Sequence, residues 1–241
     1  MERRDALPDN PDLIALSDFL ARLEAEDREA LYAIAQVRRF ARGEFVFRAD
    51  SPGTNVYVLR GGKVKINQFS PDGREMILWF CFSGEIFGLA EVTRGGGREV
   101  NAQACEDSEI LTVPQGQFCA YLERHPKAAI LSMQVLGARL RVLGNMMANL
   151  VSDDVETRIA KLILRLGARY GIREGGEIRL SVPLTHQEIA DMVGTTRQTA
   201  TSVIGALRRQ GVLSIDNHRI RIESEELLAE RSQGGRGLNR A

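Results

Sequence analysis

The chain has 241 residues, 44% of them hydrophobic and 27% charged, which is enough for two domains with apolar cores. Its formal net charge is zero, so any attraction to nucleic acid must come from local patches of positive charge. The sequence has no run of 18 apolar residues and no apolar signal-peptide core near its N-terminus. These absences argue against a membrane partner and lead us to expect a cytoplasmic protein.

The cysteines are odd in number and widely spaced, at Cys81, Cys105 and Cys119. No pair has the CxxC spacing of a metal or redox site, so we expect structural thiols and no metal. Cys81 follows Trp79-Phe80, which indicates a place in the core of the first domain, where a thiol is inert.

The first half of the chain predicts a helical segment followed by many short strands. Residues 12–38 are predicted to be helical because leucines recur on one face, at Leu16, Leu20, Leu23 and Leu31. From Phe45 the apolar period changes to two. Turn sequences then separate the strands, at Ser51-Pro52-Gly53, Gly61-Gly62, Ser70-Pro71-Asp72-Gly73 and Ser83-Gly84. This spacing predicts a β-barrel or jelly roll, which we place in an N-terminal domain over residues 1–125.

One long helix is predicted from Pro126 to about Val151, and we assign residues 126–152 to it. Its apolar residues alternate at steps of three and four, like a heptad a/d seam, at Met133, Leu136, Leu140, Leu143, Met147 and Leu150. Gly137 and Gly144 beside the seam indicate close backbone approach. With Arg139 and Arg141 flanking a narrow seam, we expect dimerisation along this helix rather than packing on the chain's own barrel.

The pattern breaks at Ser152-Asp153-Asp154, where we expect Asp153 to cap a new helix over Val155–Tyr170. This junction predicts a hinge between the part of the chain that precedes it and a further domain over residues 153–230. The tail from Arg231 to Ala241 is rich in Gly and Arg, and we predict it to be disordered.

The stretch Leu184–Gln210 predicts two short helices joined by a tight turn. Thr185 and Glu188 have the spacing of a capping box at the start of the first helix. Gly194 suits the end of that helix, and Thr195 or Thr196 can cap the second. This pattern is typical of a helix-turn-helix that lays its second helix in the major groove of DNA.

The outer face of the motif carries side chains suited to DNA. Arg197 can form a bidentate pair with guanine and Gln198 with adenine, while hydroxyl groups can bind phosphates. No acidic residue lies between Asp191 and Asp216, which avoids repulsion from a polyanion. The predicted DNA contacts are Thr185, Thr196, Arg197, Gln198, Thr199, Thr201, Ser202, Arg208 and His218.

A β-wing is predicted after the second motif helix. The segments Gly211–Ile215 and Arg219–Ile222 have strand-like composition, and Asp216-Asn217 suits the turn between them. His218, Arg219 and Arg221 either contact phosphates or are exposed wing residues.

Several motifs together resemble the Crp–Fnr transcription regulators. They are Pro52-Gly53, Tyr57-Val58-Leu59, Gly61-Gly62-Lys63-Val64-Lys65, Pro71-Asp72-Gly73-Arg74-Glu75, Gly84-Glu85-Ile86-Phe87-Gly88, Ile189-Ala190 and Gly194-Thr195-Thr196-Arg197-Gln198-Thr199. The resemblance runs from about Leu16 to Ile222. It implies an α+β fold with an N-terminal jelly-roll β-barrel, a long dimerisation helix and a C-terminal winged helix-turn-helix. It also implies a homodimer that binds an inverted-repeat operator in double-stranded DNA, with half-sites near TGTGA or TTGAC, and that contacts RNA polymerase.

The resemblance places candidate effector-binding residues at Phe87, Gly88, Leu89, Arg98, Glu99 and Leu143. Members of the family that bind cyclic AMP have a ribose-binding Glu where this chain has Leu89. They have a small hydroxyl residue where it has Glu99, and a Thr-Ser pair where it has Leu143-Gly144. Because a carboxylate beside a phosphate is repelled, we expect cyclic AMP not to be the effector.

The ligand-binding residues of other sensors in the family do not identify a cofactor or effector for this chain. Iron–sulfur sensors need cysteines near the N-terminus, and none precedes Cys81. Haem sensors use a Cys or His in the cassette, and neither occurs between Gly84 and Ala104. Arg98 suits a dicarboxylate such as 2-oxoglutarate, although Glu99 argues against an anion. The alternative function, a cyclic-nucleotide-regulated signalling module or enzyme subunit, would need a catalytic constellation, and the isolated histidines supply none.

Overall fold

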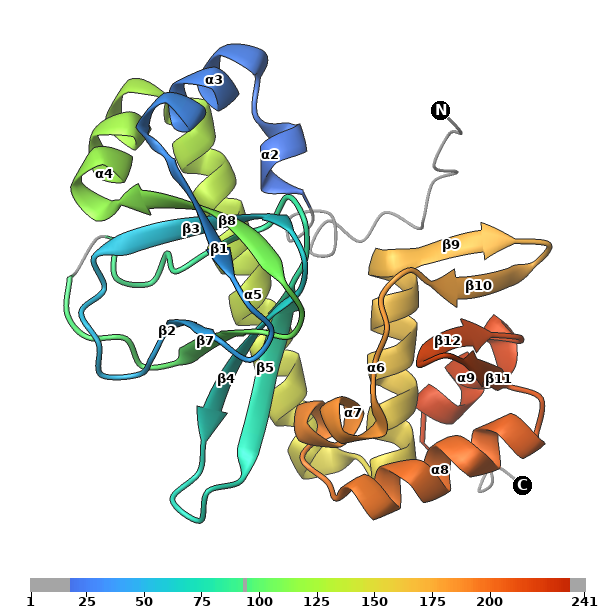
Figure 1. Cartoon of the computed structure of the whole chain (residues 1–241). Coiled ribbons are helices and arrows are strands. Elements are labelled where there is room, and N and C mark those ends of the chain that lie inside the picture. Colours follow the sequence, from blue (N-terminus) through green and yellow to red (C-terminus); the bar gives the residue numbers. More distant parts are fainter. Residues whose placement is uncertain (1–17, 93–94, 235–241) are drawn as a thin grey trace. The chain divides into compact units, whose positions relative to one another are not determined.

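Figure 1 shows the computed structural model of the chain, which describes residues 18–92 and 95–234. Two compact units are present, one within Ala15–Arg141 and the other within Val142–Ala241. The boundary between the units falls inside the longest described helix, α5 (Pro126–Ser152). A β-rich N-terminal unit, a long central helix and a C-terminal helix-turn-helix confirm the predicted α+β class.

The N-terminal unit is built on two four-stranded antiparallel sheets, with strand orders β1-β8-β3-β6 and β2-β7-β4-β5. The strands are β1 (Gln36–Phe40), β2 (Phe45–Phe47), β3 (Asn55–Gly61), β4 (Val64–Phe69), β5 (Glu75–Cys81), β6 (Ile86–Phe87), β7 (Asn101–Ala104) and β8 (Ser108–Pro114). One core cluster takes side chains from both sheets, among them Phe47, Tyr57, Ile66, Cys81 and Phe87. The predicted jelly roll and the predicted burial of Cys81 are therefore confirmed.

The prediction that residues 12–38 are helical is confirmed for most of the described part of the segment but is wrong from Gln36 onward, where the chain forms a strand. The described part of this segment contains two helices, α2 (Phe19–Arg22) and α3 (Ala25–Ile34), and then strand β1, which pairs with β8. Leu23 and Leu31 are buried, as their helical spacing indicates, whereas Leu16 lies outside the described residues. The spacing of apolar residues does not reveal which part of a segment pairs with a strand far along the chain. Helix α4 (Gln115–Arg124), which follows β8, has no counterpart in the prediction.

Helix α5 confirms the predicted long helix. Before Val142 one of its faces is buried, at Ala128, Leu131, Ser132, Val135, Ala138 and Arg139. Arg139 donates a hydrogen bond to the carbonyl of Ile86, and its guanidinium lies 5.1 Å from the centre of the Trp79 ring. The prediction that Arg139 flanks the exposed seam is therefore wrong, because this side chain faces the barrel.

The C-terminal unit combines helices with a second antiparallel sheet, ordered β11-β12-β10-β9. After α5 it contains α6 (Val155–Tyr170), β9 (Gly171–Glu174), β10 (Glu177–Leu180), α7 (His186–Val193), α8 (Arg197–Arg209), β11 (Leu213–Asp216), β12 (Arg219–Ile222) and α9 (Glu225–Ser232). The predicted burial of α6 is confirmed at Ile159, Leu162, Ile163 and Leu166. Strands β9 and β10 extend the wing into a four-stranded sheet that the sequence does not predict.

Two local predictions in this unit need correction. The wing turn is centred on Asn217 and His218, which have φ angles of 47° and 62°, rather than on Asp216-Asn217. Asp216 is the last residue of β11, where it pairs with Arg219. The predicted disordered tail begins too early, because Arg231 and Ser232 belong to α9. Residues 235–241 lie outside the described part of the chain.

Candidate functional site

The first helix of the helix-turn-helix is closed at both ends by local chemistry. The Thr185 hydroxyl accepts from the Glu188 N–H at 3.1 Å, and the Glu188 carboxylate accepts from the Thr185 N–H at 2.8 Å. This reciprocal pair is the predicted capping box. At the other end Gly194 has a φ of 68°, a left-handed conformation that favours glycine. Both predicted ends of α7 are therefore confirmed.

The second helix, α8, begins directly after the turn. Thr196 is its N-cap and accepts from the Thr199 N–H at 3.1 Å. The Thr199 hydroxyl lies 2.8 Å from the Thr196 hydroxyl, and the Thr199 side chain is half-buried. Thr199 is therefore engaged in the cap itself. Arg197 and Gln198, the first two residues of the helix, are exposed.

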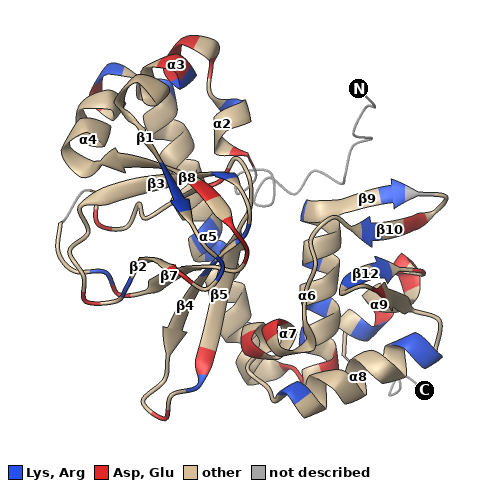
Figure 2. Ribbon diagram, in the orientation of Figure 1, with Lys and Arg blue, Asp and Glu red and all other residues tan. Residues whose placement is uncertain are grey.

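The remaining predicted DNA contacts lie on exposed surface. Figure 2 shows basic residues and no acidic ones along α8. The inner face of α8 is buried at Ala200, Ile204 and Leu207, which orients the opposite face outward. The exposed candidates are Thr185, Thr196, Arg197, Gln198, Thr201, Ser202 and Arg208, with His218 exposed at the wing turn.

Positive charge converges on His186, the first residue of α7. Its Nδ1 lies 3.0 Å from the Thr201 hydroxyl of α8. Burial lowers the pKa of His186, and the positive charges of Arg197, His218 and Arg208 lower it further. Residues from α8 and from the wing turn therefore share one electropositive region. Sequence reasoning did not select His186, although its place directly after the helix cap was visible.

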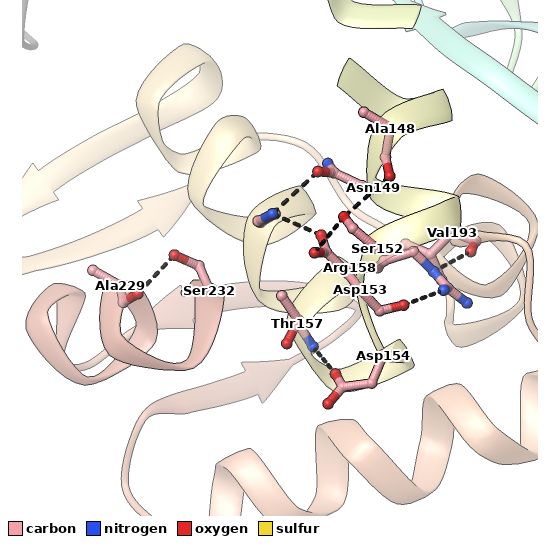
Figure 3. A network of polar contacts seen from close by, with 11 residues as sticks. Ala148, Asn149, Ser152, Asp153, Asp154, Thr157, Arg158, Val193, Ala229 and Ser232 are labelled. Carbon is pink, nitrogen blue, oxygen red and sulfur yellow. Dashed lines mark hydrogen bonds and ion pairs between the residues drawn. The ribbon is translucent and has the colours of Figure 1, made fainter. Parts of the chain in front are cut away.

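The junction between α5 and α6 is held by a polar network (Figure 3). The N-cap of α6 is Asp154, whose carboxylate accepts from the Thr157 N–H at 2.8 Å. The prediction that Asp153 is this cap is wrong. The Asp153 carboxylate instead binds the Lys161 ammonium at 2.6 Å. The three-residue spacing to Glu156 favours Asp153, but α6 begins one residue later than that spacing implies, so Asp154 is the cap and Thr157 stands three residues after it.

Arg158 connects this junction to the helix-turn-helix. Its guanidinium donates to the carbonyl of Asp153 at 2.8 Å and to the carbonyl of Val193 at 3.0 Å. Val193 is the last residue of α7. One side chain of α6 therefore fixes the end of α7 relative to the segment that follows α5 (Figure 3).

The candidate effector residues of the N-terminal unit lie mostly inside the barrel. Phe87 and Leu89 are buried, and Gly88 between them has a φ of 75°. Arg98 is buried, and its guanidinium forms an ion pair with Glu91, which the sequence reasoning did not select. Glu99 is exposed, so it is not the carboxylate beside Arg98. Leu143 is half-buried on the part of α5 that belongs to the C-terminal unit.

Comparison with known proteins assigns both units. The cyclic nucleotide-binding domain family matches residues 37–125, and the Crp-like helix-turn-helix domain family matches residues 157–231. The chain is 30% identical over 222 residues to a CRP-like cAMP-activated global transcriptional regulator of Mycobacterium tuberculosis, covering 92% of this chain and 99% of the relative. This chain belongs to the Crp–Fnr family of transcription regulators. As a member of that family, it regulates transcription and carries a DNA-binding helix-turn-helix.

Two further comparisons agree with this assignment. A global nitrogen regulator of Synechocystis is 29% identical over 196 residues, with coverage of 80% of this chain and 87% of the relative. The structure of FixK2 from Bradyrhizobium japonicum superposes with a TM-score of 0.73 at 22% identity, over 82% of this chain and 96% of that chain, which shows the shared fold. The relatives from Mycobacterium tuberculosis and Synechocystis are regulators and not enzymes.

Regulators of the Crp–Fnr family act as dimers, and α5 of this chain has an exposed apolar seam. Each of five seam residues is between 40% and 73% exposed, namely Met133, Leu136, Leu140, Met147 and Leu150. Leu143, the remaining predicted seam residue, is half-buried. Apart from its chain neighbours and the nearby backbone of α5 itself, no atom of the described residues lies within 4 Å of a Cβ added at Gly144, so the space beside the seam is open among them.

Within residues 18–92 and 95–234 no group of His, Cys, Asp and Glu could hold a metal ion. In the same part of the chain, no helix is long and apolar enough to cross a membrane.

Proposed function

We propose that this Crp–Fnr regulator works as a homodimer that reads an inverted-repeat operator and whose DNA affinity is set by the N-terminal sensing unit. The observation that carries the proposal is the exposed seam of α5. Large apolar side chains at heptad spacing are stabilised only when a second surface covers them, and a second copy of the same helix has the matching pattern. The two recognition helices of such a dimer would enter major grooves about one helical turn, ~34 Å, apart.

The exposed face of α8 supports a specific division of roles at DNA. We assign base reading to Arg197 and Gln198, because they stand at the N-terminal end of the helix that enters the groove. The hydroxyls of Thr185, Thr196, Thr201 and Ser202, together with Arg208 and His218, are assigned to phosphates. Thr199 acts through the cap that it shares with Thr196.

The effector in this proposal is not cyclic AMP, although the Mycobacterium tuberculosis relative is described as cAMP-activated. The ribose-binding carboxylate expected of a cyclic-AMP sensor is replaced by the buried, apolar Leu89. The arginine expected to hold the phosphate is already paired within the chain. Titration calorimetry with cyclic AMP tests this point, and binding at micromolar concentration would contradict it.

We assign the sensing domain to residues 1–125, the dimerisation helix to 126–152 and the DNA-binding domain to the segment from 153, extended from 230 to Ser232 because α9 ends there. RNA polymerase is the further partner expected of a regulator that acts at promoters. Because its proposed partner is chromosomal DNA, we expect the protein in the cytoplasm.

An electrophoretic mobility shift tests the proposed function. The probe is a duplex with an inverted repeat of TGTGA or TTGAC half-sites, and the control is the same duplex with both half-sites scrambled. The proposal predicts a shift of the first duplex that Arg197→Ala weakens. Equal binding of the wild-type protein to both duplexes would rule out sequence reading by α8.

A further inference from the structure

The N-terminal unit contains an ion pair that is buried from solvent. The Arg98 side chain is 1% exposed and that of Glu91 10% exposed, and the Glu91 carboxylate accepts a hydrogen bond from Arg98 Nη1. The same guanidinium donates to the carbonyls of Gly88, at 3.2 Å, and of Asn55. It also lies 4.3 Å from the centre of the Phe47 ring. Arg98 is therefore charge-neutralised and held on several sides by the chain itself.

The surrounding backbone is arranged so that Glu91 reaches Arg98. A Cβ added at Gly53 would lie 2.7 Å from Cβ and Cγ of Glu91, so only glycine leaves room for this side chain. The Gln115 amide donates to the carbonyls of Glu91, at 2.6 Å, and of Val92, at 3.0 Å. The Arg98–Glu91 contact, for which Gly53 leaves room and whose backbone Gln115 holds, is therefore part of the packed interior of the domain rather than a chance surface pair.

We propose that Glu91 is a specificity-determining residue that closes this sensor to anionic small molecules, because its carboxylate occupies the binding position at Arg98 that such a ligand would need. This inference rests on the proposed role of the N-terminal unit as a sensor. It gives that unit a defined chemical selectivity, against phosphate esters and carboxylates, and it assigns the selectivity to one side chain.

Charge and connectivity both favour the chain's own carboxylate over a ligand. Two anions cannot share one buried guanidinium without repulsion, so an entering anion has to displace Glu91. The displaced carboxylate would then be left in a desolvated place without its partner, which is strongly unfavourable. Glu91 is also tethered, so it competes at a high effective concentration for Arg98.

The test compares anion binding by the full-length wild-type protein and by Glu91→Gln, which keeps the shape and removes the charge. The probes are inorganic phosphate and cyclic AMP, measured by thermal unfolding and by titration calorimetry without DNA. We expect no stabilisation of the wild type. We expect Glu91→Gln to have a Tm lower by roughly 6–20 °C, because one partner of a buried pair is lost. Either probe should bind this variant about tenfold or more tightly than it binds the wild type and restore part of the Tm.

Three variants control this result. Glu99→Gln makes the same change at an exposed position and should alter neither Tm nor anion binding. Glu91→Gln combined with Arg98→Gln should lose the gained anion binding. In Gly53→Ala the added methyl group pushes the Glu91 side chain away from its place, so this variant should gain anion binding that is weaker than that of Glu91→Gln. It tests the proposal even if Glu91→Gln does not fold.

The proposal is overturned if the wild type binds either anion as tightly as the variants do, or if neither Glu91→Gln nor Gly53→Ala gains binding. Because these measurements contain no DNA, the anion-binding result can be interpreted even if the protein fails to shift the operator. The mobility-shift result can likewise be interpreted if the anion-binding prediction fails.

Discussion

Introducing a charge into the α5 seam should separate the two copies of the dimer. Leu140 is 73% exposed in the single chain. Full burial of a leucine contributes roughly 1.5–3 kcal/mol, so covering the exposed fraction contributes about 1–2 kcal/mol per copy and about 2–4 kcal/mol per dimer. Leu140→Glu removes this contribution and adds two facing carboxylates. We therefore expect the dimer dissociation constant to rise by at least roughly 30- to 700-fold.

Sedimentation equilibrium at several protein concentrations measures this change directly. The matched control is Asn145→Glu, which places the same charge on an exposed position of the same helix, about 140° around its axis from Leu140. The control should remain dimeric. If Leu140→Glu sediments with the wild-type dissociation constant, the seam is not the dimer interface.

Four further predictions concern the DNA-binding unit. Arg197→Ala should weaken operator binding by about 1–3 kcal/mol and relax specificity at one base, measured by anisotropy against a panel of single-base operator variants; uniform weakening would indicate a phosphate contact instead. Thr196→Ala should lower the free energy of unfolding by about 1 kcal/mol through loss of the α8 cap, measured in urea, and an unchanged midpoint would contradict the cap. Arg158→Met should lower the free energy of unfolding by about 1–3 kcal/mol, because two carbonyls lose a charged donor. A variant as stable as the wild type would show that the hydrogen bonds of Arg158 in Figure 3 do not stabilise the fold. The pKa of His186 is lowered from 6.5 in the folded chain, so its contribution to stability is full above pH 6.5 and decreases as the pH falls below that value. His186→Asn should reduce this acid dependence in urea titrations at successive pH values, and an unchanged pH profile would refute the assignment.

The sequence predicts those parts of the structure that are specified by neighbouring residues. The capping box of Thr185 and Glu188, the left-handed Gly194 and the cap at Thr196 each act over three or four residues, so the pattern alone locates both motif helices. The long apolar periodicity of α5 is equally local. For this reason the helix-turn-helix and the central helix are predicted almost to the residue.

Local sequence patterns do not predict features that depend on contacts between distant parts of the chain. Strand β1 is a strand because β8, some seventy residues later, pairs with it. Strand β10 is likewise fixed by pairing with the distant β12, and β9 joins the sheet only by pairing with β10. Arg139 lies on the same helix as the seam, and only the barrel beside it decides that it is buried. Local propensity contains none of this information.

The Arg98 environment shows the same limit at a candidate site. Adjacency along the chain directs attention to Glu99, but the fold exposes Glu99 and brings Glu91, seven residues earlier, against Arg98. The available sequence signal was Glu91 within the otherwise apolar run from Ile86 to Val92, together with a glycine at position 53 that makes room for it.

The central claim is that two copies of the chain read two symmetry-related half-sites. It is tested most directly by selecting bound duplexes from a random library and weighing the complexes by native mass spectrometry. The account predicts an inverted repeat with half-site centres about one helical turn apart and two protein chains per duplex. A single chain bound to a site without inverted symmetry would contradict it.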